Sequence, residues 1–286
     1  MNSNPQDGTS VKKYGLALHT ATPELGLAIS NFAGDSRCQT WNLGRSLATD
    51  LHQHLVEFIG PQTWADLAFI AVAKGPGGFT GTRMGMVTAR TLAQQLDIPV
   101  FAISTLAAVA WGQPPQPPLS KGGLLSAQPP LASEGLLNTE PPQPPLAKGG
   151  LLSAEPPLAK GGLLNTEAPL AKGGLLSAEP PLAKGGLVSI ALQMPAQRGQ
   201  LFGAVYSVNK DSGLTELFPD TVMTAESWQE KLESWENSYQ LIEVGSELGW
   251  SVSSVLELAY LEWKQGSRPD WSGALPYYGQ HPVKGH

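Results

Sequence analysis

The sequence predicts an α/β protein with mixed sheets, built as two similar halves that flank a run of repeats. In each half, short apolar strands come first and helical patterns follow them. Much of the unusually high content of 32 Gly and 25 Pro lies between residues 113 and 186. The 286-residue chain without that segment is long enough for two lobes of roughly 100 residues, each with a modest core.

The first half opens as a meander and then alternates helices and strands. Apolar runs and breaker residues predict strands at 14–19, 25–31, 38–43, 68–73 and 98–103, and helices at 46–59, 82–96 and 105–111. Ser104 is the expected N-cap of the last helix. Three strands followed by alternating helices and strands indicate a mixed sheet with an antiparallel start and crossover helices.

The second half repeats this plan. Its patterns predict strands at 187–193, 201–208, 214–218 and 240–244, and helices that start at Thr224 and Val252. The two halves are therefore expected to be related structures.

A twelve-residue repeat occupies most of residues 113–186. Its full units are PPLSKGGLLSAQ, PPLASEGLLNTE, PPLAKGGLLSAE, PPLAKGGLLNTE and APLAKGGLLSAE, and a partial unit follows them. A fixed period suggests a solenoid. However, ordering one unit costs about 12–24 kcal/mol of backbone entropy, while burying its leucines returns at most about 9 kcal/mol. We therefore expect the repeats to be disordered, with a binding role as the alternative.

Charge and cysteine content restrict the functional classes. The net charge is −6, and the repeat segment contributes nothing to it because its five Lys balance its five Glu. An acidic body without a Lys/Arg cluster is poorly suited to binding RNA alone, so a nucleic-acid role is expected only through a partner. Cys38 is the only cysteine, no run of 18 apolar residues occurs, and no apolar segment follows the N-terminal lysines. These features predict a cytoplasmic protein without a disulfide or a membrane contact.

A glycine-rich loop between a buried strand and a helix is the first candidate site. Its residues could approach an anion or a nucleotide at the helix N-terminus, or could simply form a tight turn. The loop matches neither the dinucleotide-binding nor the P-loop motif. The candidate binding residues are Gly75, Pro76, Gly77, Gly78, Thr80 and Gly81.

The helix after the loop carries a stripe of small residues that recur every four positions, namely Gly81, Gly85, Ala89 and Ala93. Such a stripe lets another element approach closely, either the protein's own sheet or a helix of a partner. The candidate partner-binding residues are Gly81, Arg83, Met84, Gly85, Val87, Thr88, Ala89, Leu92 and Ala93.

A metal site is not expected on the preceding helix. His52 and His54 are two residues apart, so on a helix they point in nearly opposite directions and cannot share an ion.

Four segments together resemble one known family. LALHTAT (16–22), AVAKGPGGFTGTRMGMVTARTLAQQL (71–96), AISTLAAVA (102–110) and PYYGQ (276–280) are similar to TsaB, the dimerisation subunit of the bacterial tRNA threonylcarbamoyladenosine machinery. The resemblance covers about 12–112 and 187–282. It implies two ribonuclease-H-like lobes of the ASKHA superfamily, with residues 12–105 and about 262–286 in the first lobe and residues 106–112 and 187–261 in the second.

The same resemblance implies a non-catalytic scaffold. In that family TsaD carries the metal and modifies adenosine 37 of ANN-decoding tRNAs, while TsaB holds TsaD and helps recruit the ATPase TsaE. The expected partners are thus TsaD, TsaE or a second copy of this chain, with tRNA bound only through the complex. The helices at 46–59 and 83–96 would form the contact. No cofactor would be required, and ATP or ADP would bind only in the assembled complex.

Two departures from the family pattern argue against independent catalysis. His19 stands where the family usually has an aspartate, and the stretch at 195–200, PAQRGQ, replaces a D-A-R motif and a following glutamate. A neutral imidazole does not substitute for a carboxylate at a Mg²⁺ site. An ASKHA-type kinase or ATPase that uses the glycine loop remains the alternative. A peptidase is disfavoured because neither H-E-x-x-H nor G-x-S-x-G occurs.

Overall fold

The computed structural model describes residues 14–113, 124–126, 189–210 and 213–279. Most of the repeat segment lies outside these residues, so the prediction that it is disordered is tested only at Gln113 and at 124–126. Short 3₁₀ turns connect several elements and span Gly44–Ser46, Trp64–Asp66, Gln197–Gly199, Gly249–Ser251 and Trp271–Gly273.

The first sheet has five strands in the order β3-β2-β1-β4-β5. They are β1 (Tyr14–His19), β2 (Glu24–Ser30), β3 (Ser36–Asn42), β4 (Leu67–Ala73) and β5 (Val100–Ile103). The first three strands pair antiparallel, and β4 joins β1 and β5 in parallel. The prediction of a mixed sheet with an antiparallel start is confirmed.

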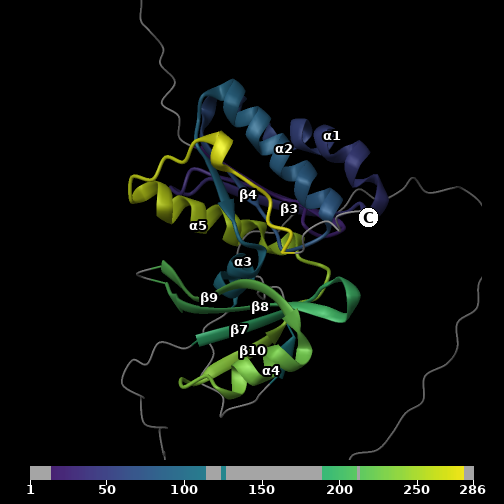
Figure 1. The fold of residues 1–286 in the computed structure, drawn as a ribbon. Helices are drawn as coiled ribbons and strands as arrows, with labels where there is room; N and C mark the ends of the chain where they lie inside the picture. Colours follow the sequence, from purple (N-terminus) through teal and green to yellow (C-terminus); the bar gives the residue numbers. More distant parts are fainter. Residues whose placement is uncertain (1–13, 114–123, 127–188, 211–212, 280–286) are drawn as a thin grey trace, which may run out of the picture. The chain divides into compact units, whose positions relative to one another are not determined.

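Helices cover both faces of this sheet (Figure 1). On one face α1 (Leu47–Ile59) and α2 (Phe79–Leu96) lie side by side and bury a core that includes Leu16, Leu18 and Ile70. On the other face α5 (Val252–Lys264) packs against β1, β2 and β4. Alternate residues of β1 and β4 therefore supply two separate cores.

The second sheet also has five strands, in the order β6-β10-β7-β8-β9. They are β6 (Leu124–Ser126), β7 (Ser189–Pro195), β8 (Gln200–Asn209), β9 (Gly213–Thr224) and β10 (Tyr239–Glu243). One helix, α4 (Ala225–Glu233), packs on β8 and β9, with Thr224 as its N-cap as predicted. The fold is thus two mixed-sheet α/β lobes, as the sequence predicts.

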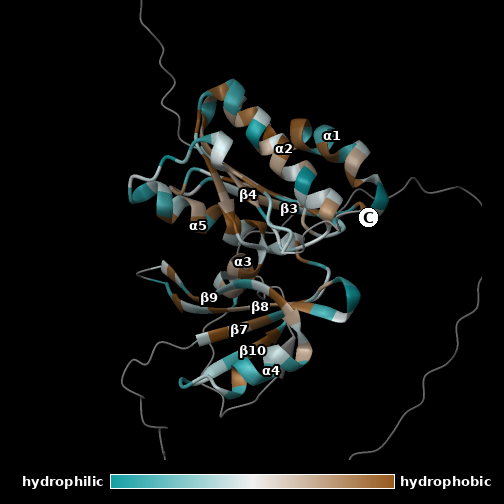
Figure 2. Ribbon diagram, viewed as in Figure 1, coloured by the Kyte–Doolittle hydropathy of each residue, from teal (hydrophilic) through white to brown (hydrophobic). Residues whose placement is uncertain are grey.

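A buried helix connects the two lobes. All residues of α3 (Thr105–Gly112) except Gly112 are buried, and α3 contacts α5, β7 and β8. Its predicted cap is confirmed, since the Ser104 hydroxyl accepts a hydrogen bond from the Ala107 N–H at 3.1 Å. Figure 2 shows brown, hydrophobic colour on β4 and β7, while α1 and α4 alternate in colour as surface helices do.

Apart from shifts of one or two residues at the ends of strands and helices, the structure differs from the sequence prediction at three places. Helix α2 starts at Phe79, three residues earlier than predicted, and β9 continues from the predicted strand as far as Thr224. Residues 124–126, in the first repeat unit, form a strand where disorder was expected. The predicted lobe boundary at 261/262 falls inside α5, and the lobe limits stay a prediction.

Among the residues that the structure describes, no helix has both the length and the apolar character needed to cross a membrane.

Candidate functional site

The glycine loop lies between β4 and α2 and packs against the backbone that follows β1. The Gly78 N–H donates to the Ala21 carbonyl at 2.7 Å. A Cβ on Gly77 would lie 2.2 Å from the Ala21 carbonyl oxygen, and one on Gly81 would lie 2.1 Å from the Thr20 carbonyl oxygen. Both positions therefore need glycine for the close approach of two backbone segments, which is the tight-turn interpretation of the motif.

A hollow of about 730 Å³ opens beside the start of α2. No side chain caps this helix, and its first three residues line the hollow. The opposite wall comes from the second lobe through Met194, Gln197 and Ser246. The structure thus brings the glycine loop and the 195–200 stretch to one place.

Only part of the predicted anion site faces this hollow. Gly78, Thr80 and Gly81 line it. Gly75 and Pro76 are buried, and Gly77 packs on Ala21, so these three residues belong to the turn.

The residues around the hollow do not fit a magnesium nucleotide. Among the described residues that line it, Arg45 is the only cation and no carboxylate is present. His19, at the position of the family's aspartate, is 0% exposed and neither ring nitrogen has a hydrogen-bond partner. Burial lowers the pKa of His19 to about 4, so the ring is neutral at pH 7. Mg²⁺ prefers oxygen ligands, and the described residues that line the hollow supply no side-chain carboxylate.

The small-residue stripe of α2 packs inward, which corrects the prediction that it meets a partner. Ala89 and Ala93 are 0% exposed and belong to the core beneath α2. A Cβ on Gly85 would lie 2.1 Å from the Thr20 hydroxyl. The alternative interpretation, close packing of α2 on its own sheet, is the one that the structure shows.

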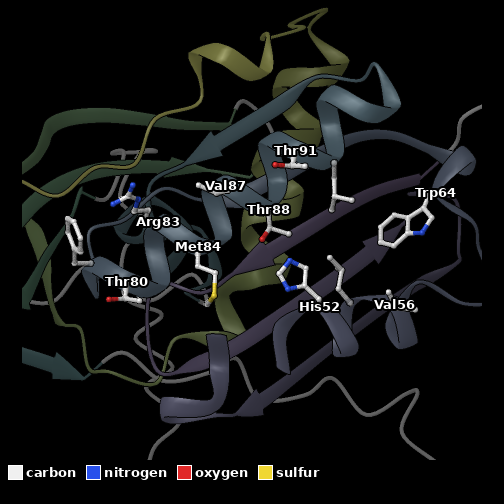
Figure 3. A pocket seen from close by; sticks show the side chains of 12 residues that line it. His52, Val56, Trp64, Thr80, Arg83, Met84, Val87, Thr88 and Thr91 are labelled. Carbon is white, nitrogen blue, oxygen red and sulfur yellow. The ribbon is translucent and has the colours of Figure 1, made fainter. Parts of the chain in front are cut away.

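The other face of α2 forms a groove with α1, which we call the α1–α2 groove. It has a volume of about 590 Å³ and contains five of the predicted partner residues, Arg83, Met84, Val87, Thr88 and Leu92. In Figure 3, Met84 and Thr88 from α2 point towards His52 from α1, and Trp64 lies at one end.

The α1–α2 groove concentrates exposed apolar surface. Val56, Phe79 and Val87 are 63%, 53% and 54% exposed, and all three line it. Leu217 and Leu275 are the other exposed large hydrophobic residues of the described chain, and neither lies there. Several exposed apolar side chains gathered in one groove, with polar His52, Thr80 and Arg83 beside them, are typical of a protein contact site.

The two histidines on α1 lie apart, as their spacing predicts. His52 lines the α1–α2 groove, whereas the His54 ring packs on Trp41 with 4.6 Å between ring centroids. In the described part of the chain no three His, Cys, Asp or Glu residues gather in a way that could hold a metal ion.

The sequence analysis missed a polar cluster between the lobes. Asp220 on β9 accepts hydrogen bonds from the Ser104 hydroxyl at 2.6 Å and from the Tyr206 hydroxyl at 2.7 Å. Burial raises the pKa of Asp220. The residues are distant in sequence and share no motif, so no sequence signal could have grouped them.

Comparison with known proteins gives matches to the glycine loop and to the fold. A family model described as "TsaD: tRNA N6-adenosine threonylcarbamoyltransferase" matches residues 59–121. The "tRNA threonylcarbamoyladenosine biosynthesis protein TsaB" of Bacillus subtilis (strain 168) is 56% identical over 45 residues, which is 16% of this chain and 20% of that protein. The protein of the same name from Buchnera aphidicola subsp. Schizaphis graminum (strain Sg) is 48% identical over 48 residues, 17% of this chain and 23% of that protein.

A solved structure, YeaZ from Pseudomonas aeruginosa, shares the fold. Its TM-score is 0.56 at 16% identity, and the match covers 93% of this chain and 100% of YeaZ. The matched stretch spans about a fifth of the length of the two TsaB proteins, so it leaves the activity of the whole protein as a proposal. Together, the two TsaB matches, the family match across the glycine loop and the shared fold support the resemblance of this chain to TsaB.

Proposed function

We propose that this chain is a non-catalytic scaffold subunit of the complex that forms N6-threonylcarbamoyladenosine at position 37 of ANN-decoding tRNAs. It would bind and support the catalytic TsaD subunit. The observation that carries the proposal is the α1–α2 groove, on the two helices where the resemblance places the TsaD contact.

The groove suits an apolar helix or ridge of a protein partner. Exposed Val56 on α1 and exposed Val87 on α2 both line it, and half-buried Met84 and Leu92 belong to the same lining. An amphipathic helix seats its apolar side chains in a groove of this kind. Arg83 is the only Lys, Arg, Asp or Glu among the described residues that line it, so a mainly apolar partner surface would fit.

The absence of a carboxylate among the described residues that line the interlobe hollow supports a scaffold rather than an enzyme. Kinases and ATPases hold Mg²⁺ and phosphate with carboxylates and a cationic loop residue. We propose that ATP or ADP binds only in the assembled complex. An ASKHA-type nucleotide-binding enzyme is the alternative function, and nucleotide turnover by the isolated chain would favour it.

The rest of the assembly follows from the same proposal. TsaE would join the complex of this chain with TsaD, a second copy of this chain could take the same groove when TsaD is absent, and tRNA would be held through the partners. The complex would work in the cytoplasm.

The test is binding to TsaD of the same organism, measured by light scattering after size exclusion and by calorimetry. Val87→Asp places a charge on an exposed residue in the groove, so the fold should remain and the affinity should fall about tenfold or more. Val56→Asp on the opposite wall should act in the same way.

The matched control is Leu217→Asp on β9, where the side chain is 42% exposed and lies outside the groove. It should bind TsaD with the affinity of the unmodified chain. The proposal would be contradicted if the chain forms no complex with TsaD, or if the groove variants bind TsaD as well as the control does.

A further inference from the structure

The two sheets share one plan, and the repeat segment completes the second. In the first sheet β4 follows the antiparallel β1-β2-β3 meander, and β5 pairs with it in parallel as the fifth strand. In the second sheet β10 has the place of β4, next to β7 and parallel to it. After β10 the chain leaves for α5, which packs on the first sheet, and the described residues after β10, up to residue 279, form no further strand.

The fifth place is taken by Leu124–Ser126, from the first repeat unit. It pairs with β10 in parallel, with Leu124 opposite Leu241 and Leu125 opposite Ile242. Without β6, the outer edge of β10 would present unpaired N–H and C=O groups. The three repeat residues thus act as an added strand at an edge.

Other units carry nearly the same tripeptide. Leu-Leu followed by Ser or Asn occurs in every full unit, at residues 124–126, 136–138, 151–153, 163–165 and 175–177. Strand addition depends on main-chain hydrogen bonds, which do not distinguish identical sequences. A three-residue pairing also specifies its occupant weakly.

Chain length lets each full unit reach β10. The first tripeptide starts 11 residues after Gln113, and the last ends 12 residues before Ser189. At about 3.3 Å per residue, 12 residues span up to about 40 Å. Crossing from the far end of β10 to the start of β7 requires only about 20 Å, given five residues along the strand and two strand spacings.

We propose that the outer edge of β10 (Tyr239–Glu243) is a strand-receiving site, and that the Leu-Leu-(Ser/Asn) tripeptides of the repeat units occupy it interchangeably within one chain. Tethering keeps several equivalent occupants at high effective concentration, so the edge stays covered when one unit is altered. The repeats then serve as redundant caps of the second sheet.

The experiment is hydrogen exchange of the β10 amides in the full chain. In the first-unit variant, Leu124→Pro and Leu125→Pro are combined. Successive N–H groups of a strand point to opposite sides, so this pair removes whichever donor faces β10. In the all-unit variant both leucines of each full unit become proline. If the five occupants are equivalent, the first-unit variant keeps four of them, so the protection factor of the β10 amides should fall by only about 1.25-fold. In the all-unit variant the same protection factor should fall by about tenfold or more.

The matched control carries the same two prolines just upstream, Ser120→Pro with Lys121→Pro, and should exchange like the unmodified chain. Amides of β7 and β8 report that each variant is folded. Adding the free peptide PPLAKGGLLSAE to the all-unit variant should restore the protection of β10, and the same peptide with Pro-Pro in place of Leu-Leu should not.

Three results would overturn the proposal. If the first-unit variant loses as much protection as the all-unit variant, the site is specific for 124–126. If the all-unit variant keeps full protection, the repeats do not cover β10. If protection in the unmodified chain rises with protein concentration, the pairing joins different chains.

Discussion

At the residue scale, His19 places a titratable side chain in the core at the end of β1. The imidazole is 0% exposed and has no hydrogen-bond partner, so it is held as a neutral, mostly apolar ring. Its folded pKa of about 4 lies below the unfolded value of about 6.5. Below pH 6.5 the unfolded chain therefore binds more protons at this residue than the folded chain, and stability falls as the pH falls towards 4.

We expect His19→Leu to remove this acid sensitivity. Between pH 7.5 and 5.0 the unmodified chain should lose about 2 kcal/mol of unfolding free energy relative to the variant. Urea unfolding at the two pH values measures the difference. Asp220 and Glu262, whose pKa values are raised by burial, are present in both proteins and cancel in the comparison. If the unfolding free energy of the two proteins depends equally on pH, His19 is not buried in its neutral form.

The glycine loop gives a second residue-scale prediction. Gly81→Ala would place a Cβ 2.1 Å from the Thr20 carbonyl oxygen, so the backbone must shift, and we expect a loss of about 1–3 kcal/mol. Gly78→Ala is the matched control because the nearest atom, the Ala21 carbonyl oxygen, would be 3.7 Å away. Thermal unfolding should show a clearly lower Tm for the first variant only, and equal Tm values would mean that the loop is not in close contact.

At the element scale, α2 presents two different faces, and a pair of leucine substitutions separates them. Ala89 is fully buried, so Ala89→Leu overpacks the core and should cost about 1–3 kcal/mol. Gln94 on the same helix is exposed, and Gln94→Leu should stay within about 0.5 kcal/mol of the unmodified chain. Chemical denaturation checks both values. If Ala89→Leu is as stable as the unmodified chain, the small-residue stripe does not pack against the core.

The same helix shows what sequence could and could not predict. Most predicted helices and strands agree with the structure to within a few residues. The signals that predict them, apolar spacing and capping residues such as Ser104 and Thr224, are local in sequence. The stripe on α2 was correctly recognised as a close-packing face, but its partner is set by tertiary structure. Exposed Val56 and Val87 come from two helices, so the α1–α2 groove exists only once both are packed.

Strand β6 was missed for a physical reason as well. A repeat unit that buries only its own leucines does not recover the backbone entropy that it loses on ordering. An existing sheet edge changes this balance because β10 supplies a preformed partner for main-chain hydrogen bonds. The strand order shows this edge, because β6 is the outermost strand and pairs with β10 alone.

At the scale of the whole molecule, Asp220 connects segments of both lobes. Its carboxylate accepts from Ser104, which follows β5 of the first sheet, and from Tyr206 on β8 of the second. Its carbonyl accepts from the Tyr277 hydroxyl, and the Tyr277 N–H donates to the Lys74 carbonyl after β4. The C-terminal segment, the glycine-loop region and the second sheet therefore meet through this one aspartate.

Asp220→Ala tests how much this connection contributes. The variant removes the acceptor of the Ser104 hydroxyl and the nearer acceptor of the Tyr206 hydroxyl, which keeps only the Ser104 hydroxyl oxygen at 3.3 Å, and an unsatisfied buried group costs about 1–3 kcal/mol. We expect urea unfolding to show a total loss of about 2–4 kcal/mol, because some of the cost is relieved when the Ser104 hydroxyl turns. Glu236→Ala, at an exposed residue before β10, is the control and should change stability by less than about 0.5 kcal/mol. If the two variants are equally stable, the Asp220 carboxylate does not contribute to holding the lobes together, and the buried α3 with its apolar neighbours and the remaining hydrogen bonds make that connection.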